Sequence, residues 1–243
     1  MIRKLGWLAA GGFGVGIIAF GLVAALGAHE LPWRQISSIW PLASSCSGGE
    51  DVNVDPTVTE RHWAWEGGDS VEIAVPGTVH YRGGRGDEVT ARGPAEALAH
   101  LRVHDGRINY TCGGRWGQRD LDITLPGRAF RAVTISGSGK LIMQDIDQPS
   151  LDLAISGSGS MRAQGASERV RISIAGAGNA KLAELTIKRL DVDIAGSGDI
   201  EAAPQEALNV DIAGSGNIRL LSDPAVVHTD IKGSGRVIRA SSR

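Results

Sequence analysis

Six copies of one short motif follow one another in the second half of the chain, and this repeat restricts the possible folds more than any other feature. Each copy reads isoleucine, small residue, glycine, small residue, glycine, except that Lys232 replaces the first small residue in the last copy. The isoleucines are Ile135, Ile155, Ile174, Ile194, Ile212 and Ile231, at intervals of 20, 19, 20, 18 and 19 residues. A fixed period of this size is typical of a solenoid, in which each repeat forms one coil of a continuous stack.

Apolar residues alternate along each repeat, which predicts a β-strand that ends at the motif. The residues two positions before the isoleucines are Val133, Leu153, Ile172, Val192, Val210 and Thr229. If the alternation continues, both glycines of each motif face inward, and Leu141, Met161, Ala180, Ile200, Ile218 and Val237 follow them into the core. We expect the glycines to narrow the coil and permit a turn, because they have no Cβ. They are Gly137, Gly139, Gly157, Gly159, Gly176, Gly178, Gly196, Gly198, Gly214, Gly216, Gly233 and Gly235.

The repeats therefore predict an all-β fold: a single right-handed parallel β-helix of about six regular coils over residues 128–240. Residues 50–127 are less regular, and we interpret them as a β-rich cap with the first coils. Strands are expected at 61–65, 70–75, 87–91 and 121–125, with a hairpin at Asp105-Gly106 and one or two helical turns in PAEALAHL.

The residues between the two glycines of each motif predict a flat face of small side chains. They are Ser138, Ser158, Ala177, Ser197, Ser215 and Ser234. Beside them, Asp193, Asp211 and Asp230 occupy matching positions in successive coils, about 5 Å apart if the strands stack. A bound cation would relieve the repulsion between these carboxylates, but we favour a solvated face offset by nearby lysine and arginine side chains.

The amino terminus predicts a membrane anchor. Residues 5–28 contain no charged or strongly polar side chain, and 24 helical residues are long enough to cross a bilayer. We therefore interpret 1–28 as a single-pass transmembrane helix, with a cleaved signal peptide as the alternative. Residues 29–49 then form a linker. Cys46 and Cys112 are the only cysteines; outside the cytoplasm they favour one disulfide, and two free thiols remain the alternative.

The six serial motifs, the V-x-I alternation before them and Leu125-Pro126-Gly127 resemble the bacterial head GIN domain family, described as putative autotransporter adhesins. The resemblance covers about residues 50–240. It implies a secreted or envelope-bound β-helix-like domain, and it carries over no catalytic residue.

The sequence offers little else that points to an activity. With 25 basic and 27 acidic residues, the chain has no basic field for nucleic acid. There is no G-x-S-x-G or phosphate-binding loop, and the hairpin keeps His100 and His104 off one helical face. We predict no catalytic, cofactor or metal-binding residues.

The favoured function is a non-catalytic module on the outer face of the bacterial inner membrane, which binds an unknown envelope protein or polymer through the Ser/Ala/Asp-lined face. Cleavage of the amino-terminal segment would make it a secreted protein. A structural spacer or self-associating solenoid is one alternative, and a polysaccharide lyase or hydrolase is another.

Overall fold

The computed structural model of the protein describes residues 55, 57, 59–111 and 121–240. Strands dominate these residues, and α2 (Ala95–His100) is the one helix among them. The strands are β1 (Glu60–Ala64), β2 (Ser70–Ala74), β3 (Thr78–Arg82), β4 (Glu88–Arg92), β5 (Leu101–His104), β6 (Arg107–Tyr110), β7 (Asp122–Thr124), β8 (Ala132–Gly137), β9 (Lys140–Gly157), β10 (Ser160–Gly176), β11 (Asn179–Gly196), β12 (Asp199–Gly214), β13 (Asn217–Leu220), β14 (Val226–Gly233) and β15 (Arg236–Arg239). The chain is thus an all-β solenoid.

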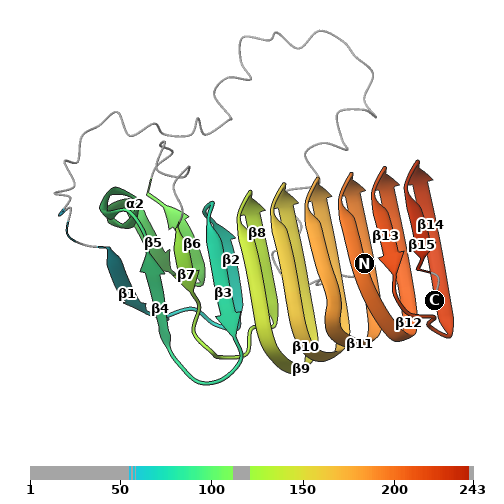
Figure 1. The fold of residues 1–243 in the computed structure, drawn as a ribbon, viewed down its shortest axis with the longest axis horizontal. Helices are drawn as coiled ribbons and strands as arrows, with labels where there is room; N and C mark the ends of the chain where they lie inside the picture. Colours follow the sequence, from blue (N-terminus) through green and yellow to red (C-terminus); the bar gives the residue numbers. More distant parts are fainter. Residues whose placement is uncertain (1–54, 56, 58, 112–120, 241–243) are drawn as a thin grey trace, which may run out of the picture. The chain divides into compact units, whose positions relative to one another are not determined.

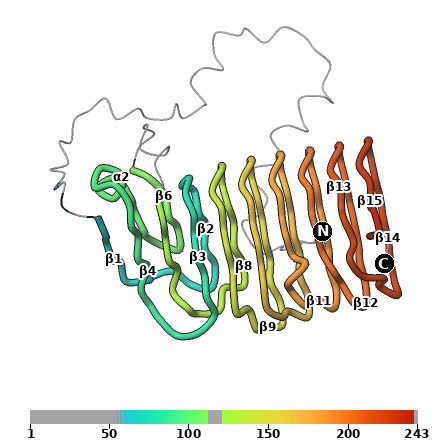
Figure 2. The backbone as a smooth tube through the Cα atoms, in the orientation of Figure 1, coloured from blue at the N-terminus to red at the C-terminus, as the bar shows by residue number. Residues whose placement is uncertain are grey.

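The six repeats stack in parallel register, one coil on the next (Figures 1 and 2). Ile135 of β8 pairs with Ile155 of β9, and the row of isoleucines continues without a shift to Ile231 of β14. The stack comprises about five turns, rather than the six coils predicted, because six motifs enclose five intervals. The varying coil length is absorbed away from the motif, where the pairing of β11 with β12 shifts between Leu182 and Ile187.

Each coil presents two long walls that meet at the glycine motif. We call the strand segments that end at the first glycine, such as Ala132–Gly137, the first wall. The segments that begin after the second glycine, such as Asn217–Leu220, form the second wall. On this wall Leu141 pairs with Met161, and the row continues through Ala180, Ile200 and Ile218 to Val237. The isoleucines and this second row line one apolar interior.

The two glycines of a motif have different roles, so the prediction that both face inward was wrong. The first glycines have φ between 107° and 139°, a region that L-residues with a Cβ rarely adopt. This left-handed residue breaks the alternation of the strand, and only the second glycine then enters the core. Gly139, Gly159, Gly178, Gly198 and Gly216 are accordingly buried, whereas none of the first glycines is.

Backbone hydrogen bonds continue from coil to coil around this corner. The Ser158 N–H donates to the Gly137 carbonyl at 2.9 Å, and the Ser160 N–H donates to the Gly139 carbonyl at 2.9 Å. Equivalent bonds of 2.8–3.1 Å join every later pair of coils. The turn therefore leaves few buried backbone groups without a partner, which a corner of a stacked sheet must avoid.

A coil without the glycine motif is inserted before the regular stack. On the first wall β2 pairs with β8 on one side and β6 on the other, with Val71 opposite Val133 and Ile73 opposite Ile135. On the second wall β3 lies between β7 and β9, with Val79 opposite Leu141. After β2 and β3 the chain forms the rest of the cap. It then places β6 and β7 on one side of these two strands and β8 and β9 on the other. The strand β3 was not predicted.

The cap closes the amino-terminal end of the core. The expected hairpin is confirmed, because β5 and β6 pair antiparallel around Asp105 and Gly106, whose φ values are 47° and 75°. The expected strands correspond to β1, β2, β4 and β7, and the expected helical turns to α2. The ring of Phe130 packs edge-on against Trp65 and Tyr81, with centroids 5.3 Å and 5.6 Å away. These aromatic rings fill the core where the regular aliphatic column ends.

Within the described residues no helix has the length and apolar character needed to cross a bilayer. The predicted anchor at 1–28, the linker at 29–49 and both Cys46 and Cys112 lie outside the described residues.

Candidate functional surfaces

The corner between the two walls carries the row of small residues expected from the repeats. Ser138, Ser158, Ala177, Ser197, Ser215 and Ser234 are all exposed. They stand between glycines that stack in register, so the corner is a narrow ridge of backbone and small side chains. It offers serine hydroxyl groups to a partner.

The outward face of the first wall carries one row of aspartates among side chains of both charges. Asp193 pairs with Asp211, and Asp211 pairs with Asp230, so three carboxylates form one row as expected. Only Asp230 has a salt-bridge partner among the described residues, Lys232 at 3.1 Å. The part of the chain that the structure describes contains no group of three His, Cys, Asp or Glu side chains placed to hold a metal ion.

The outward face of the second wall carries a row of charged side chains in which cations outnumber anions. Arg162, Lys181, Glu201 and Arg219 follow one another in register on neighbouring strands. Lys140 and Arg236 belong to the adjacent row, with Ser160, Asn179, Asp199 and Asn217 between them. No salt bridge involves any of these five cations in the described ranges. Their charge is therefore available to an external anion.

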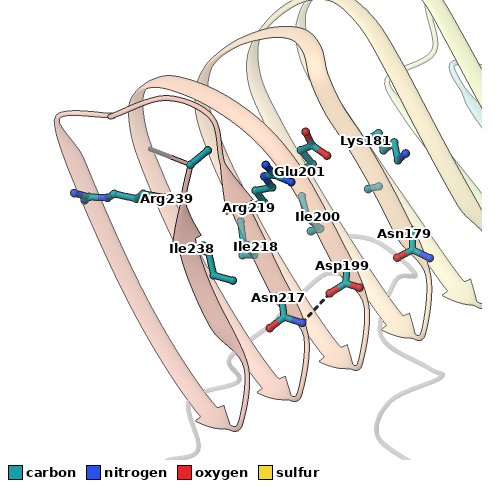
Figure 3. Close-up of a pocket in the computed structure, with 12 residues that line it drawn as sticks. Asn179, Lys181, Asp199, Ile200, Glu201, Asn217, Ile218, Arg219, Ile238 and Arg239 are labelled. Atoms are coloured by element: carbon teal, nitrogen blue, oxygen red, sulfur yellow. Dashed lines mark hydrogen bonds between the residues drawn. The ribbon is translucent and has the colours of Figure 1, made fainter. Parts of the chain in front are cut away.

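A shallow hollow of about 640 Å³ follows this second wall (Figure 3). Figure 3 shows Lys181, Glu201 and Arg219 along one line, with Asn179, Asp199 and Asn217 along the next. The Asn217 amide donates a hydrogen bond to the Asp199 carboxylate at 3.0 Å, which orients both side chains. The exposed side chain of Ile238 supplies apolar lining.

A second hollow, of about 470 Å³, continues the first toward the amino-terminal coils. The two hollows share Asn179 and Lys181. The second one adds Lys140, Ile142 and Arg162 to the lining. Together the hollows form a strip that crosses the second-wall strands from β9 to β15, and we call this strip the second-wall groove.

The two histidines that the sequence singles out lie apart from these surfaces. His100 is the last residue of α2, whereas His104 lies in β5, so they do not share a helical face. The Nδ1 atom of His104 is 3.7 Å from the Asp105 carboxylate. Both residues belong to the cap rather than to either wall.

Sequence reasoning singled out the serine and aspartate rows and missed the second-wall groove. A signal was present: Arg162, Lys181, Glu201 and Arg219 each follow the second glycine of a motif by three residues. Such alternate outward positions are readable once the repeats are aligned. The alignment alone does not show that most residues of this row are cations without a salt bridge among the described residues. That result required the strand pairing seen in the structure.

Comparison with known proteins identifies the family. The sequence profile described as "putative auto-transporter adhesin, head GIN domain" matches residues 95–224. The chain belongs to the head GIN domain family. The match spans α2, the end of the cap and most of the glycine motifs, and no curated protein matches the chain.

Solved structures show the same head GIN fold. A putative adhesin from Bacteroides fragilis NCTC 9343 has a TM-score of 0.60 and 15% sequence identity, covering 77% of this chain and 99% of that one. A putative adhesin from Parabacteroides distasonis ATCC 8503 has a TM-score of 0.50 and 16% identity, covering 77% and 98%. At this identity the similarity concerns the fold.

Proposed function

We propose that this head GIN domain protein is a non-catalytic binding module of the bacterial envelope, and that it holds an extended anionic polymer in the second-wall groove. The observation that carries the proposal is a set of four cations that line the groove and have no salt bridge among the described residues: Lys140, Arg162, Lys181 and Arg219. Three carboxylates, of Glu184, Asp199 and Glu201, lie beside them. The adhesin descriptions of the family and of its structural neighbours agree with attachment rather than catalysis. The apolar segment at 1–28 supports a location at the membrane.

The groove suits a long and repetitive partner. Neighbouring strands lie about 4.8 Å apart, so equivalent side chains repeat along the stack at that distance. Over the first three residues after each glycine motif, the strands from β9 to β13 pair residue by residue, and the shifts in pairing lie beyond these residues. A polymer that crosses the coils would therefore meet a cation or a hydrogen-bonding side chain at nearly every step.

Each exposed cation contributes little on its own, typically less than about 1 kcal/mol. Several such contacts on one chain add together, because the first contact holds the rest of the polymer near the wall. Binding of this kind weakens with salt, since the charges are exposed to solvent.

The first wall is the alternative contact surface, as expected from the sequence. Its serine ridge and aspartate row would select a neutral or cationic partner. A matched pair of variants separates the two walls. Lys181→Gln with Arg219→Gln removes two cations from the groove. Arg169→Gln with Arg171→Gln removes two cations from the first wall instead, and neither has a salt bridge among the described residues.

The experiment is titration calorimetry of the full chain in detergent micelles with polygalacturonate, and with neutral dextran as the reference polymer. We expect binding of polygalacturonate only, with an affinity reduced about tenfold in the groove variant, at roughly 0.7 kcal/mol for each cation. The control variant should match the wild type. Equal losses in the two variants, or equal binding of dextran, would refute the groove as the site.

A carbohydrate-active enzyme is the second candidate function, because the carboxylates of Asp199 and Glu201 both line the groove. Paired carboxylates are what glycoside hydrolysis requires. The same polygalacturonate mixture tests this directly. We expect no new reducing ends, and turnover that Glu201→Gln abolishes would replace the binding proposal with an enzymatic one.

A further inference from the structure

Within the described residues, no further strand pairs with the last coil of the solenoid. The large apolar side chains that are exposed in the described ranges all belong to the last coil: Leu221 (40%), Val226 (61%), Val227 (36%), Ile231 (36%) and Ile238 (50%). Ile212, which precedes Ile231 in the inward row, is only 2% exposed. Val227 and Ile231 continue the inward row of the first wall, whereas Val226 and Ile238 lie opposite the outward residues Ala207 and Arg219. Among the described residues nothing covers the inward side of the last coil, while the cap exposes no large apolar side chain in its described part.

The backbone at this end also has free hydrogen-bonding groups. In the described part of the chain β14 pairs only with β12, and β15 only with β13, so the two strands end the stack (Figure 1). Three residues before the isoleucine of β9, the Asp152 N–H donates back to the Arg131 carbonyl of the preceding coil at 2.7 Å. His228 has the same position in β14, so its N–H points to β12. Alternate residues of a parallel strand point their polar groups the same way, so Val227, Thr229 and Ile231 direct theirs to the open side.

We propose that the open end binds a second copy of this chain, with β14 antiparallel to β14 of the partner about a two-fold axis at Thr229. In this register Thr229 lies opposite the partner's Thr229. On the inward side, Val227 lies opposite the partner's Ile231. The two aliphatic interiors then become continuous, and the free edges satisfy each other.

Charge selects this register over its neighbours. With the axis at Thr229, His228 lies opposite the partner's Asp230 on both sides of the axis. Moving the axis by one residue to Asp230 places the two Asp230 carboxylates opposite each other and His228 opposite the partner's Lys232. Opposed carboxylates destabilise a sheet, whereas the His228 ring can donate a hydrogen bond to the carboxylate of the partner's Asp230.

Cations at the edge do not prevent this contact. Lys232, Arg236 and Arg239 are cations of the kind that protects an exposed strand from association, and Arg236 lies on β15 rather than on the contact strand β14. However, Lys232 is engaged by Asp230 at 3.1 Å, and Arg239 by Asp223 at 3.4 Å. A two-fold contact also uses the same end of both copies, so it closes at a dimer and does not extend into a fibre.

A cysteine on the proposed axis tests the register. In the full chain with Cys46→Ser and Cys112→Ser, Thr229→Cys should form a disulfide-linked dimer under mild oxidation. The opposed Cα atoms of a hydrogen-bonded antiparallel pair are about 5.5 Å apart, within reach of a disulfide. Val226→Cys is the matched control, because its two copies would lie roughly 20 Å apart along the strands. Equal crosslinking of the two variants would overturn the proposal.

Oligomeric state provides the second measurement. Analytical ultracentrifugation of the full chain in detergent should show a dimer, and Ile231→Lys should show a monomer. Thr229→Pro should also be monomeric while keeping the melting temperature, because the lost N–H points away from β12. A monomeric wild type would refute the dimer. Polygalacturonate binding is measured separately, so failure of the dimer leaves the proposed function untouched.

Discussion

The Cγ2 methyl group of Ile155 lies against Gly178 of the next coil, so closely that a Cβ on residue 178 would come within 2.5 Å of it. The same relation joins Ile135 with Gly159, and three later pairs, at 2.7–2.9 Å. The isoleucine of one motif thus occupies the space left by the second glycine of the following motif. This contact explains why the two residues recur together at a fixed distance.

Gly178→Ala should destabilise the solenoid by about 1–3 kcal/mol, because the added methyl group overpacks a filled core. Urea unfolding, followed by circular dichroism, measures the change. Ser197→Ala, at the exposed ridge of the next corner, should remain within about 0.5 kcal/mol of the wild type. Ile155→Leu removes the Cγ2 branch, so it should reduce the penalty of Gly178→Ala in the double variant. An additive double variant would contradict the contact.

The two tyrosines of the described residues should respond in opposite ways to loss of their hydroxyl groups. The Tyr81 hydroxyl donates a hydrogen bond to the Arg128 carbonyl at 3.0 Å. The Tyr110 hydroxyl is buried and has no hydrogen-bond partner among the described residues. We expect Tyr81→Phe to cost about 1 kcal/mol and Tyr110→Phe to be neutral or stabilising. Thermal unfolding of the two variants measures the change in stability. A larger loss of stability for Tyr110→Phe than for Tyr81→Phe would contradict this prediction.

Alkaline pH should destabilise the fold through the same two side chains. Burial raises the pKa of both Tyr81 and Tyr110. Above the usual tyrosine pKa of about 10, the unfolded chain therefore loses these protons while the folded chain retains them. Because the folded state then binds more protons, stability falls as the pH rises through this window. In the double variant Tyr81→Phe with Tyr110→Phe, the urea midpoint should fall less steeply with rising pH than in the wild type. An unchanged slope of midpoint against pH would refute this prediction.

The periodicity of the sequence was sufficient for the solenoid and for the register of its coils. Few folds other than a solenoid are compatible with a repeat of about nineteen residues that contains one invariant isoleucine. In the structure, the isoleucine of each repeat pairs with the isoleucine of the next. The inward direction of Gly137 was mispredicted because strand alternation fails at a residue with φ of 107°. The placement of β2 and β3 between β6–β7 and β8–β9 could not be read from the sequence, because it depends on pairing between segments that are distant along the chain.

The candidate surfaces were less accessible to prediction. Asp193, Asp211 and Asp230 stand at equal offsets from the isoleucine, so their row followed from the alignment alone. The groove is different, since its shape depends on how the second-wall side chains lie across several coils. The sequence identifies Lys181 and Arg219 as cations. Only the structure shows that neither has a salt bridge among the described residues.

Asp211→Asn should stabilise the fold, because Asp211 lies between Asp193 and Asp230 and loses repulsion from both. We expect a gain of about 0.2–1 kcal/mol at low salt. The gain should shrink with added salt, since the screening length falls from about 30 Å at 0.01 M to about 3 Å at 1 M. Urea unfolding at the two ionic strengths measures it.

Asp152→Asn is the matched control for this row. Asp152 lies on the same wall but pairs with Ala132 and Arg171, so its removal relieves no like charge in those pairs. It should be neutral or slightly destabilising at both ionic strengths. A different outcome would revise the solvated interpretation: if Ca²⁺ raised the melting temperature of the wild type and of Asp152→Asn but not of Asp211→Asn, the aspartate row would be a cation site.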